Sequence, residues 1–452
     1  MPTLEFHGYD AHAAHASYLE IVEVVRTLAY ADEIVFDLPR ESGSRVLDMS
    51  GRSRPFVRVH SRSRERAEEL VERIARFCDV EAASLTHFKQ ETAMDMTTQP
   101  QFLTETEIVR GIAPIRQFGL AIVLHQVFSS PLDDLLAQGS TLTAAEAASA
   151  SALVPERVEA ILIFLANEGY MRREGASFQP NAEYLRARRC KGWYTMFVGG
   201  YSPTLLGLEP CLRDRDLAAP RDLGLVGEGS CAISRHDAIP LARALMARSG
   251  RSHRRLLDLG CGNAAFLAEL CLAFPDLHAI GIEPSEGGVA AAEALIAEQG
   301  LRERVEIVHS GALAYLDELH RQPSSARPDL TILSFVLHEV LGQDGREAVV
   351  RLLRELSNAG PELDIIIIEV DDASMDPRSM SQPLARNYYN LYYLLHQFTR
   401  QKLVAPSVWE GIFADAGLVV VARDHAPPEV DSTQFEVGYL LRCAPAGRSA
   451  ER

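Results

Sequence analysis

The chain has 452 residues, which is long enough for two or three domains that each bury a hydrophobic core. Its 45 basic and 62 acidic side chains give a formal net charge of −17, which argues against general affinity for nucleic acid or for anionic membranes. Seven cysteines without a Cys-x-x-Cys pair argue against a disulfide framework or a zinc knuckle, and without an apolar run of about eighteen residues or a leader we expect a soluble, cytoplasmic protein.

Residues 1–92 predict a small α+β domain. Its expected elements follow the order β-α-β-β-α-β and cover residues 3–7, 13–30, 33–38, 56–59, 64–77 and 84–88. This order resembles units of the tautomerase superfamily, in which a proline exposed by loss of the initiator methionine acts as a base, and Pro2 would take that role here. The alternative is a domain that only packs or dimerises, because proline occurs at any position with a frequency of about 5%.

A polar linker leads into a predicted winged-helix domain at residues 102–190. Helices are expected at 108–128, 132–136, 143–150 and 155–168, followed by a β-wing at 169–178. Transcriptional regulators share this order, but the last of these helices carries three glutamates (156, 159 and 168) against the single Arg157. A helix that reads the major groove needs basic and amide side chains. We therefore expect no nucleic-acid partner.

Residues 191–250 are predicted to form connecting helices. Within them the segment WYTMFVGGY, at 193–201, places paired glycines among aromatic side chains, which suits either a bend beside a ligand or a plain hinge. Residues 251–445 then alternate apolar strand-like runs with helical segments, which is typical of an α/β domain. Its seven strands are expected at 256–259, 278–282, 305–308, 329–335, 365–369, 418–421 and 435–441.

The first strand of this domain ends in a glycine-rich turn. Gly260-Cys261-Gly262 follows the strand, a helix is expected at 264–274, and the second strand ends in Glu283. A backbone that a ligand can approach closely, a helix N-terminus and a carboxylate for ribose hydroxyls together suit a nucleotide-like cofactor. The third glycine of a dinucleotide-binding turn is missing, so no pyrophosphate cradle is evident.

The spacing of Asp258, Gly260 and Gly262, with an acid about twenty residues later, resembles motif I of class I S-adenosylmethionine (SAM) methyltransferases. This resemblance implies a Rossmann-like sheet of seven strands and SAM as cofactor. The cofactor-binding residues that it implies are Asp258, Gly260, Gly262, Glu283, Pro284, Ser310, Gly311, Ser334 and Phe335. The winged-helix domain is similar to the dimerisation domain of small-molecule O-methyltransferases, which implies a homodimer.

Two histidines are candidates for the reaction itself. His338 and Glu339 follow the fourth strand, where open α/β sheets place functional residues. His396 lies in the segment NYYNLYYLLHQFT, which follows the fifth strand and is expected to cover the substrate pocket. Two imidazoles beside a carboxylate suit iron or another divalent metal with open coordination positions. The alternative is a metal-free O-methyltransferase in which His338 acts as general base.

Several segments together resemble the 2-ketoarginine C-methyltransferases and the related iron-dependent phenylpyruvate C-methyltransferase, over about residues 105–442. They are WYTMFVGGY, GEGSCAISRHDAIPLAR, LLDLGCGNAAFL, FVLHEVLGQDG, IIIIEVDD, YYNLYYLLHQFT and EVDSTQFEVGYLLR. The resemblance implies methylation of the carbon next to the ketone of a small 2-oxo acid, through a metal-stabilised enolate, in specialised amino-acid or natural-product biosynthesis.

Carried over by motif, the resemblance also implies roles for individual residues. His338 and His396 would hold the metal, and His338 and Glu339 would be the catalytic residues. The substrate would lie against Trp193, Tyr201, Tyr389 and Tyr393. Residues 1–92 have no counterpart in the family pattern, and a tautomerase-like domain could supply the enol form of the same 2-oxo acid.

Overall fold

The computed structural model describes residues 103–444 except 325, 326 and 361, together with four short strands near the N-terminus. The chain divides into two units, Met1–Ile108 and Val109–Arg452. In the first, β1 (Val35–Asp37) pairs antiparallel with β4 (Arg58–His60), and β2 (Val46–Leu47) pairs with β3 (Ser53–Arg54). β1 and β4 overlap two predicted strands, whereas Pro2 and the predicted helices of residues 1–92 lie outside the described residues.

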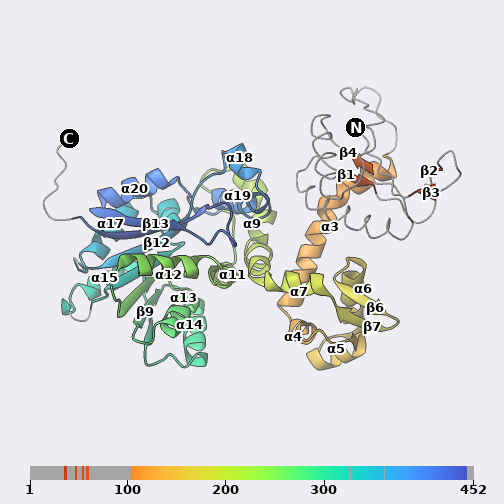
Figure 1. Cartoon of the computed structure of the whole chain (residues 1–452), viewed down its shortest axis with the longest axis horizontal. Coiled ribbons are helices and arrows are strands. Elements are labelled where there is room, and N and C mark those ends of the chain that lie inside the picture. Colours follow the sequence, from red (N-terminus) through yellow and green to blue (C-terminus); the bar gives the residue numbers. More distant parts are fainter. Residues whose placement is uncertain are drawn as a thin grey trace, which may run out of the picture. The chain divides into compact units, whose positions relative to one another are not determined.

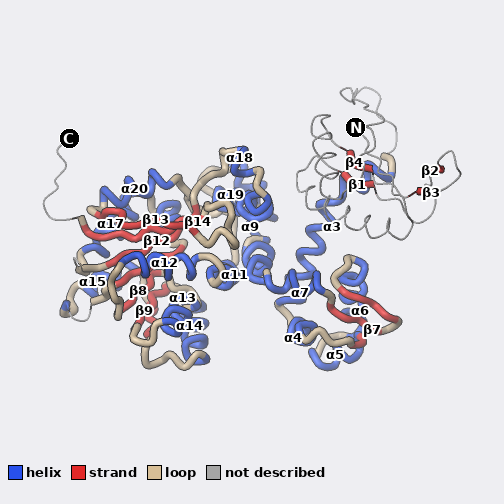
Figure 2. Tube along the Cα trace, in the orientation of Figure 1, coloured by secondary structure: helices blue, strands red, loops and turns tan. Residues whose placement is uncertain are grey.

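The second unit begins with helices and a small sheet, as the sequence predicted (Figures 1 and 2). The helices are α3 (Glu105–Phe128), α4 (Leu132–Ala137), α5 (Ala144–Ser151), α6 (Pro155–Asn167) and α7 (Ala182–Arg189). The sheet has the order β5-β7-β6 and consists of β5 (Leu142–Thr143), β6 (Met171–Glu174) and β7 (Ser177–Pro180). Leu124, Leu162 and Phe178 are among the buried residues of its core.

The helix α3 differs from the expectation of no long apolar segment. Among the described residues it is the helix whose length and composition would allow it to cross a membrane, although Arg110 and Arg116 interrupt it. Core helices of soluble proteins meet the same two criteria. Its exposed apolar side chains include Val109, Ile112, Ile115 and Phe118, and because residues three apart are neighbours on the helix surface, these four form a stripe that winds around the helix.

Connecting helices follow, as expected, but one of them is a π-helix. These elements are α8 (Lys191–Trp193), the π-helix η1 (Tyr194–Gly200), α9 (Ser202–Leu206), α10 (Leu208–Arg213), α11 (Leu223–Ser234) and α12 (Ala238–Ser249). A Cβ atom at Gly200 would lie 2.6 Å from Val226 Cγ2, and one at Gly229 would lie 2.5 Å from the Met196 nitrogen. Glycine is therefore required where η1 and α11 meet.

The remaining residues form the predicted seven-stranded sheet, in the order β10-β9-β8-β11-β12-β14-β13 (Figure 2). Its strands are β8 (Arg255–Leu259), β9 (His278–Glu283), β10 (Val305–His309), β11 (Leu330–Ser334), β12 (Asp364–Val370), β13 (Leu418–His425) and β14 (Glu436–Cys443). Six of these strands run in the same direction, and β14 runs antiparallel between β12 and β13. The strand order reverses between β8 and β11, which is where ligands bind in such sheets.

Helices pack on the sheet and bury two apolar clusters. The helices that follow the strands are α13 (Ala265–Ala273), α14 (Glu286–Glu298), α15 (Ala312–Leu319), α16 (Leu337–Gln343), α17 (Arg346–Ser357) and α20 (Pro406–Asp415). One cluster includes Leu353, Ile367 and Trp409, and the other includes Leu267 and Ile366. Ile366 and Ile367 are successive residues of β12, and their side chains point to opposite faces. Both faces of the sheet are therefore covered, which explains why β12 is almost purely aliphatic.

The segment after β12 contains α18 (Pro377–Met380), the π-helix η3 (Ala385–Tyr389) and α19 (Asn390–Phe398). Here Tyr389, Tyr392 and Tyr393 are buried in an aromatic cluster with Phe197 and Tyr201. The predicted insertion therefore contributes its tyrosines to a wall that includes residues of the connecting helices.

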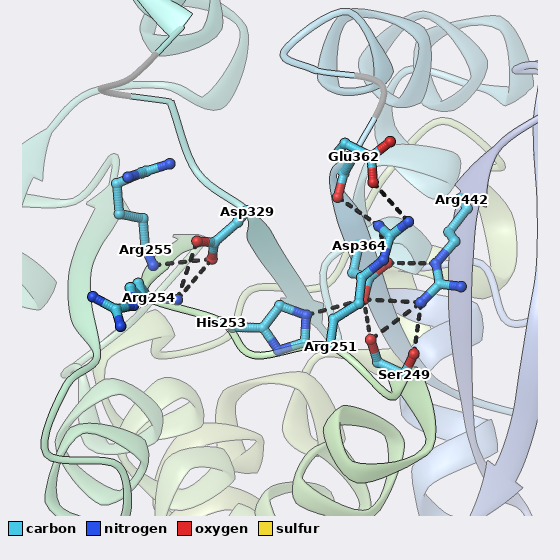
Figure 3. Close-up of polar contacts among 9 residues, drawn as sticks. All are labelled: Ser249, Arg251, His253, Arg254, Arg255, Asp329, Glu362, Asp364 and Arg442. Carbon is cyan, nitrogen blue, oxygen red and sulfur yellow. Dashed lines mark hydrogen bonds and ion pairs between the residues drawn. The ribbon is translucent and has the colours of Figure 1, made fainter.

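Two aspartates make hydrogen bonds at the N-terminal ends of the parallel strands, away from the ends at which ligands bind in such sheets (Figure 3). Asp329, before β11, accepts the backbone N–H groups of Arg254 and Arg255 at the start of β8. Asp364 is the first residue of β12, and its side chain is fully buried. It accepts hydrogen bonds from the side chains of Ser249, Arg251, His253 and Arg442.

Candidate functional site

The glycine turn after β8 lies against the neighbouring strand and the next crossover. The backbone nitrogens of Gly260 and Cys261 both donate to the Ile282 oxygen of β9, at 2.8 and 3.0 Å. Gly260 has φ +83°, and a Cβ atom there would lie 2.9 Å from Val336 Cγ2. Only glycine therefore suits this position, both for its backbone conformation and for space.

Two buried acids stand at this turn. Glu283, at the end of β9, accepts the backbone N–H of Gly262 at 3.0 Å and that of Ser285 at 2.9 Å, one on each carboxylate oxygen. Burial, together with the charge of Glu283, raises the pKa of Asp258 to about 7. Glu283 was predicted from the sequence as a ribose ligand, and its carboxylate also holds the glycine turn in place.

The turn opens into a cavity of about 1050 Å³. Of the nine predicted cofactor residues, seven line it: Asp258, Gly260, Gly262, Glu283, Pro284, Ser334 and Phe335. Ser310 and Gly311 do not line the cavity, although the Ser310 backbone nitrogen donates to the backbone oxygen of Glu283 at 3.2 Å. Phe335 has φ +58°, a conformation that is rare for a bulky side chain and that concentrates at functional sites.

The same cavity reaches the two predicted histidines, both of which line it. His338 is 2% exposed and His396 1%, and their ring centroids are 5.2 Å apart. His338 Nδ1 lies 2.7 Å from Glu369 Oε2, and His396 Nδ1 lies 2.7 Å from the backbone oxygen of Tyr392. Both partners accept hydrogen bonds, so each Nδ1 carries the hydrogen and each Nε2 keeps a lone pair.

The surroundings shift the pKa values of the two imidazoles in opposite directions. Burial lowers the pKa of His338, but the Glu369 carboxylate outweighs it and the net shift is upward. Burial, and then the charge of His338, lower the pKa of His396 well below its ordinary value. His396 Nε2 is buried and makes no hydrogen bond to any residue that the structure describes. A neutral imidazole with a free lone pair is the form that ligates metals or accepts a proton.

Glu339 lines the cavity beside His338, but an arginine that the sequence did not single out binds it. Arg221 donates to both carboxylate oxygens of Glu339, at 2.7 Å each. Gln401 Nε2 donates to Glu339 Oε1 at 2.7 Å and lies 3.3 Å from His338 Nε2. Burial alone would raise the pKa of Glu339, but Arg221, His338 and Gln401 together lower it.

Comparison with known proteins identifies the family. Residues 257–361 match a family model described as a methyltransferase domain. The 2-ketoarginine methyltransferase of Streptomyces arginensis is 37% identical over 340 residues, which is 75% of this chain and 96% of that protein. The chain belongs to the 2-ketoarginine methyltransferase family. It is a SAM-dependent methyltransferase, so the resemblance inferred from motif I and the seven-stranded fold are both confirmed.

Solved structures confirm the fold of this methyltransferase. The structure of LaPhzM has a TM-score of 0.53 at 14% identity and covers 75% of this chain and all of that one. The structure of PigF with SAH has a TM-score of 0.51 at 17% identity, again over 75% of this chain and all of the other. At these identities the likeness extends to the fold alone.

The aromatic residues predicted to touch substrate divide into two groups in the methyltransferase. Tyr201 lines the cavity, and its hydroxyl donates to Gln401 Oε1 at 3.2 Å. Trp193, Tyr389 and Tyr393 do not line it, and the Tyr389 and Tyr393 hydroxyls bond instead to Asp431 and to the Asp371 backbone. Tyr392 does line it, with its ring centroid 3.8 Å from that of His396.

The structure brings together the two histidines that were predicted to hold a metal. Among the residues that the structure describes, no group of three or more histidine, cysteine, aspartate or glutamate side chains is arranged to hold a metal ion. The two imidazoles do fit one as donors, since each has its Nδ1 hydrogen bonded; among the described residues His396 Nε2 has no partner, and His338 Nε2 lies 3.3 Å from Gln401 Nε2. Glu339, the neighbouring carboxylate, is held by Arg221.

Proposed function

We propose that this methyltransferase transfers the methyl group of SAM to the carbon next to the ketone of a small 2-oxo acid, such as 2-ketoarginine. Two findings support the proposal. The relative from Streptomyces arginensis is named for 2-ketoarginine. The observation that carries it is the pair of buried imidazoles, His338 and His396, which line the cavity that motif I opens into and whose Nδ1 atoms are both hydrogen bonded.

The chemistry explains why such a pair is useful. Carbon is a poor nucleophile until the adjacent ketone is enolised. A divalent metal such as iron, held by His338 and His396, would supply the Lewis acidity that stabilises the enolate. The hydrogen bonds to Glu369 and to the Tyr392 oxygen orient the two rings for this role. The remaining requirement is placement of the carbon in line with the methyl group, which is a matter of proximity and orientation.

We assign removal of the proton from this carbon to Glu339. In the free protein its ion pair with Arg221 lowers its basicity. The carboxylate of a 2-oxo acid can take over hydrogen bonds of Arg221, which would free an oxygen of Glu339 and raise the pKa of that group. Arg221 therefore acts in this proposal as the receptor for the substrate carboxylate.

O-methylation is a second candidate because His338 and Glu369 also have the geometry of a general base. The 2.7 Å contact between them fixes the tautomer and would stabilise the protonated imidazole. In that reaction His338 Nε2 would accept the proton of a hydroxyl group, without a metal.

A mass-spectrometric screen of 2-oxo acids with SAM separates the two functions. We expect a gain of one methyl group on a 2-oxo acid, and NMR should place it on the carbon next to the ketone. The reaction should stop on chelation and recover when iron or another divalent metal is returned. A methyl group on oxygen, with activity that chelators leave unchanged, would establish the O-methyltransferase instead.

We further propose that the protein is a homodimer, with exposed apolar side chains of α3 buried by the second copy. Val109, Ile112, Ile115 and Phe118 are each more than half exposed in the single chain. Light scattering coupled to size exclusion should give twice the chain mass, and Ile115→Glu should shift the protein towards monomer. Leu206→Glu, which changes an equally exposed leucine on α9, should leave the mass unchanged. A wild-type monomer would overturn this proposal.

A further inference from the structure

Three acids are buried together beside the aromatic wall of the site. Asp237 stands at the N-terminus of α12, Asp431 in the loop before β14, and Glu436 at the first position of β14. Glu436 pairs in register with Val370, the last residue of β12, so it lies at the carboxyl end of that parallel strand. This is the end of the sheet at which Glu369 holds His338.

Asp431 has a structural role that uses both of its oxygens. It accepts the Tyr389 hydroxyl at 2.8 Å and the Glu436 backbone nitrogen at 3.2 Å on one oxygen. On the other it accepts the backbone N–H and the hydroxyl of Thr433. Asp431 therefore fixes the loop that presents Glu436.

Asp237 and Glu436 instead form a pair with unused capacity. Their carboxyl groups hydrogen-bond to each other, so one proton lies between them. Glu436 is 2% exposed, and its buried Oε1 atom has no hydrogen-bond partner in the part of the chain that the structure describes. Burial raises the pKa of Asp237 to about 6 and that of Glu436 well above its ordinary value, and the charged groups that add to the shift are carboxyls. A pair that shares one proton carries one negative charge, and among the described residues no basic side chain contributes to these pKa shifts.

Aromatic rings connect this pair to the histidines. Burial, followed by the charges of Asp237 and Glu436, raises the pKa of Tyr388 well above its ordinary value, so Tyr388 lies close to the pair. Its ring centroid is 5.9 Å from that of Tyr392, and Tyr392 lies 3.8 Å from His396. On its other side Tyr388 packs edge-on against Trp193 at 6.2 Å.

We propose that Glu436 and Asp237 form the subsite that receives the cationic end of the substrate, a guanidinium group or a similar planar cation. A guanidinium presents parallel N–H donors that match a carboxylate, and it packs well against aromatic faces. Its single positive charge balances the single negative charge of the proton-sharing pair. This inference rests on the proposed function, because it assumes that the 2-oxo end of the same molecule lies at His338 and His396.

Glu339 is a weaker candidate for this role, although its carboxylate also lines the cavity. Arg221 already neutralises Glu339. Glu436, nearly one hundred residues further along the chain, has a buried carboxylate oxygen that no described residue bonds.

Two substrates of the same shape test the subsite: 5-guanidino-2-oxopentanoate, whose side chain is cationic, and 5-ureido-2-oxopentanoate, whose side chain is neutral. We expect wild-type kcat/KM to favour the guanidino compound by roughly a hundredfold, since buried hydrogen bonds to charged groups have that effect. Glu436→Gln should reduce this preference at least about tenfold, mainly through KM, and Asp237→Asn should act in the same direction. Glu429→Gln removes an exposed carboxylate from the same loop and should leave the preference unchanged.

The controls distinguish failure of the proposed subsite from failure of the proposed function. Thermal unfolding and calorimetric titration with SAM show whether each variant is folded. A wild-type preference near one, or a preference that folded Glu436→Gln and Asp237→Asn both retain, would overturn the subsite while leaving 2-oxo acid methylation intact. If the enzyme methylates no 2-oxo acid at all, the proposed function itself is wrong. Should neither variant fold, the wild-type preference decides.

Discussion

Replacing His396 with alanine should reduce methylation of 2-oxo acids by roughly a thousandfold in kcat/KM, the scale of losing an essential catalytic group. The reason is the buried Nε2 atom of His396, which has no partner among the described residues and belongs to a side chain that lines the same cavity as His338. If His338 alone acts as a base, the loss should be no more than about tenfold, because the substitution then removes only packing against Tyr392. The size of the effect therefore distinguishes a shared site from a single base.

The measurement combines three quantities for wild type and variant: kcat/KM by mass spectrometry, bound metal by elemental analysis, and SAM affinity by calorimetry. We expect metal content and activity to fall together in His396→Ala while SAM affinity is retained. His278→Ala is a matched control, because this exposed histidine stands at the opposite end of the sheet, at the first residue of β9. A variant with normal metal content and near-normal turnover would rule out ligation by His396.

Asp364→Asn should lower the free energy of unfolding by about 3–5 kcal/mol, which is typical when a buried ion pair loses one partner. Asp364 accepts the Arg442 Nε–H at 2.6 Å and lies 2.9 Å from His253 Nε2, with its side chain fully buried. The change leaves both arginines, Arg251 and Arg442, without their shared carboxylate (Figure 3). Because this cluster lies at the end of the sheet away from the histidines, kcat should change little below the melting temperature. Chemical denaturation and steady-state kinetics check the two statements.

The same hydrogen bonds predict how the difference in unfolding free energy between wild type and Asp364→Asn depends on pH. Burial alone would raise the pKa of Asp364, but hydrogen bonds from His253, Arg442 and Ser249 hold it far below its ordinary value. A carboxylate with a depressed folded-state pKa contributes stability that is complete above its unfolded pKa, about 4, and that is lost as pH falls below it. The gap between wild type and Asp364→Asn should therefore be constant near neutrality and shrink below about pH 4. Glu362→Gln, at an exposed partner of Arg251, should change stability by less than about 0.5 kcal/mol. A gap that grew on acidification would contradict this account.

Local patterns were sufficient to predict the sheet and the cofactor turn. The run of isoleucines in β12 and the glycines of the turn after β8 reflect burial and backbone geometry, which depend on neighbouring residues. The contact of Glu369 with His338 could also have been predicted, because Glu369 lies near the end of β12, beside the strand that precedes His338. From the sequence, Glu369 was identified only as the last residue of the predicted strand 365–369.

The partners of Glu339 could not be predicted in the same way. Arg221 is 118 residues away and Gln401 is 62, so no local spacing connects them to Glu339. The tyrosines show a different limit. The sequence placed Tyr389, Tyr392 and Tyr393 on one insertion, but which of them faces the cavity depends on the π-helix η3, and a pattern of 3.6 residues per turn does not predict that geometry.

The two hydrogen bonds of Glu283 also bear on the entropy of cofactor binding. Its carboxylate fixes the Gly262 and Ser285 nitrogens before any ligand arrives. A loop that is already ordered loses little conformational freedom when a ligand binds, so more of the contact energy appears as affinity. The turn of this methyltransferase is therefore preorganised, and we expect SAM to bind it with little rearrangement of the backbone between residues 260 and 285.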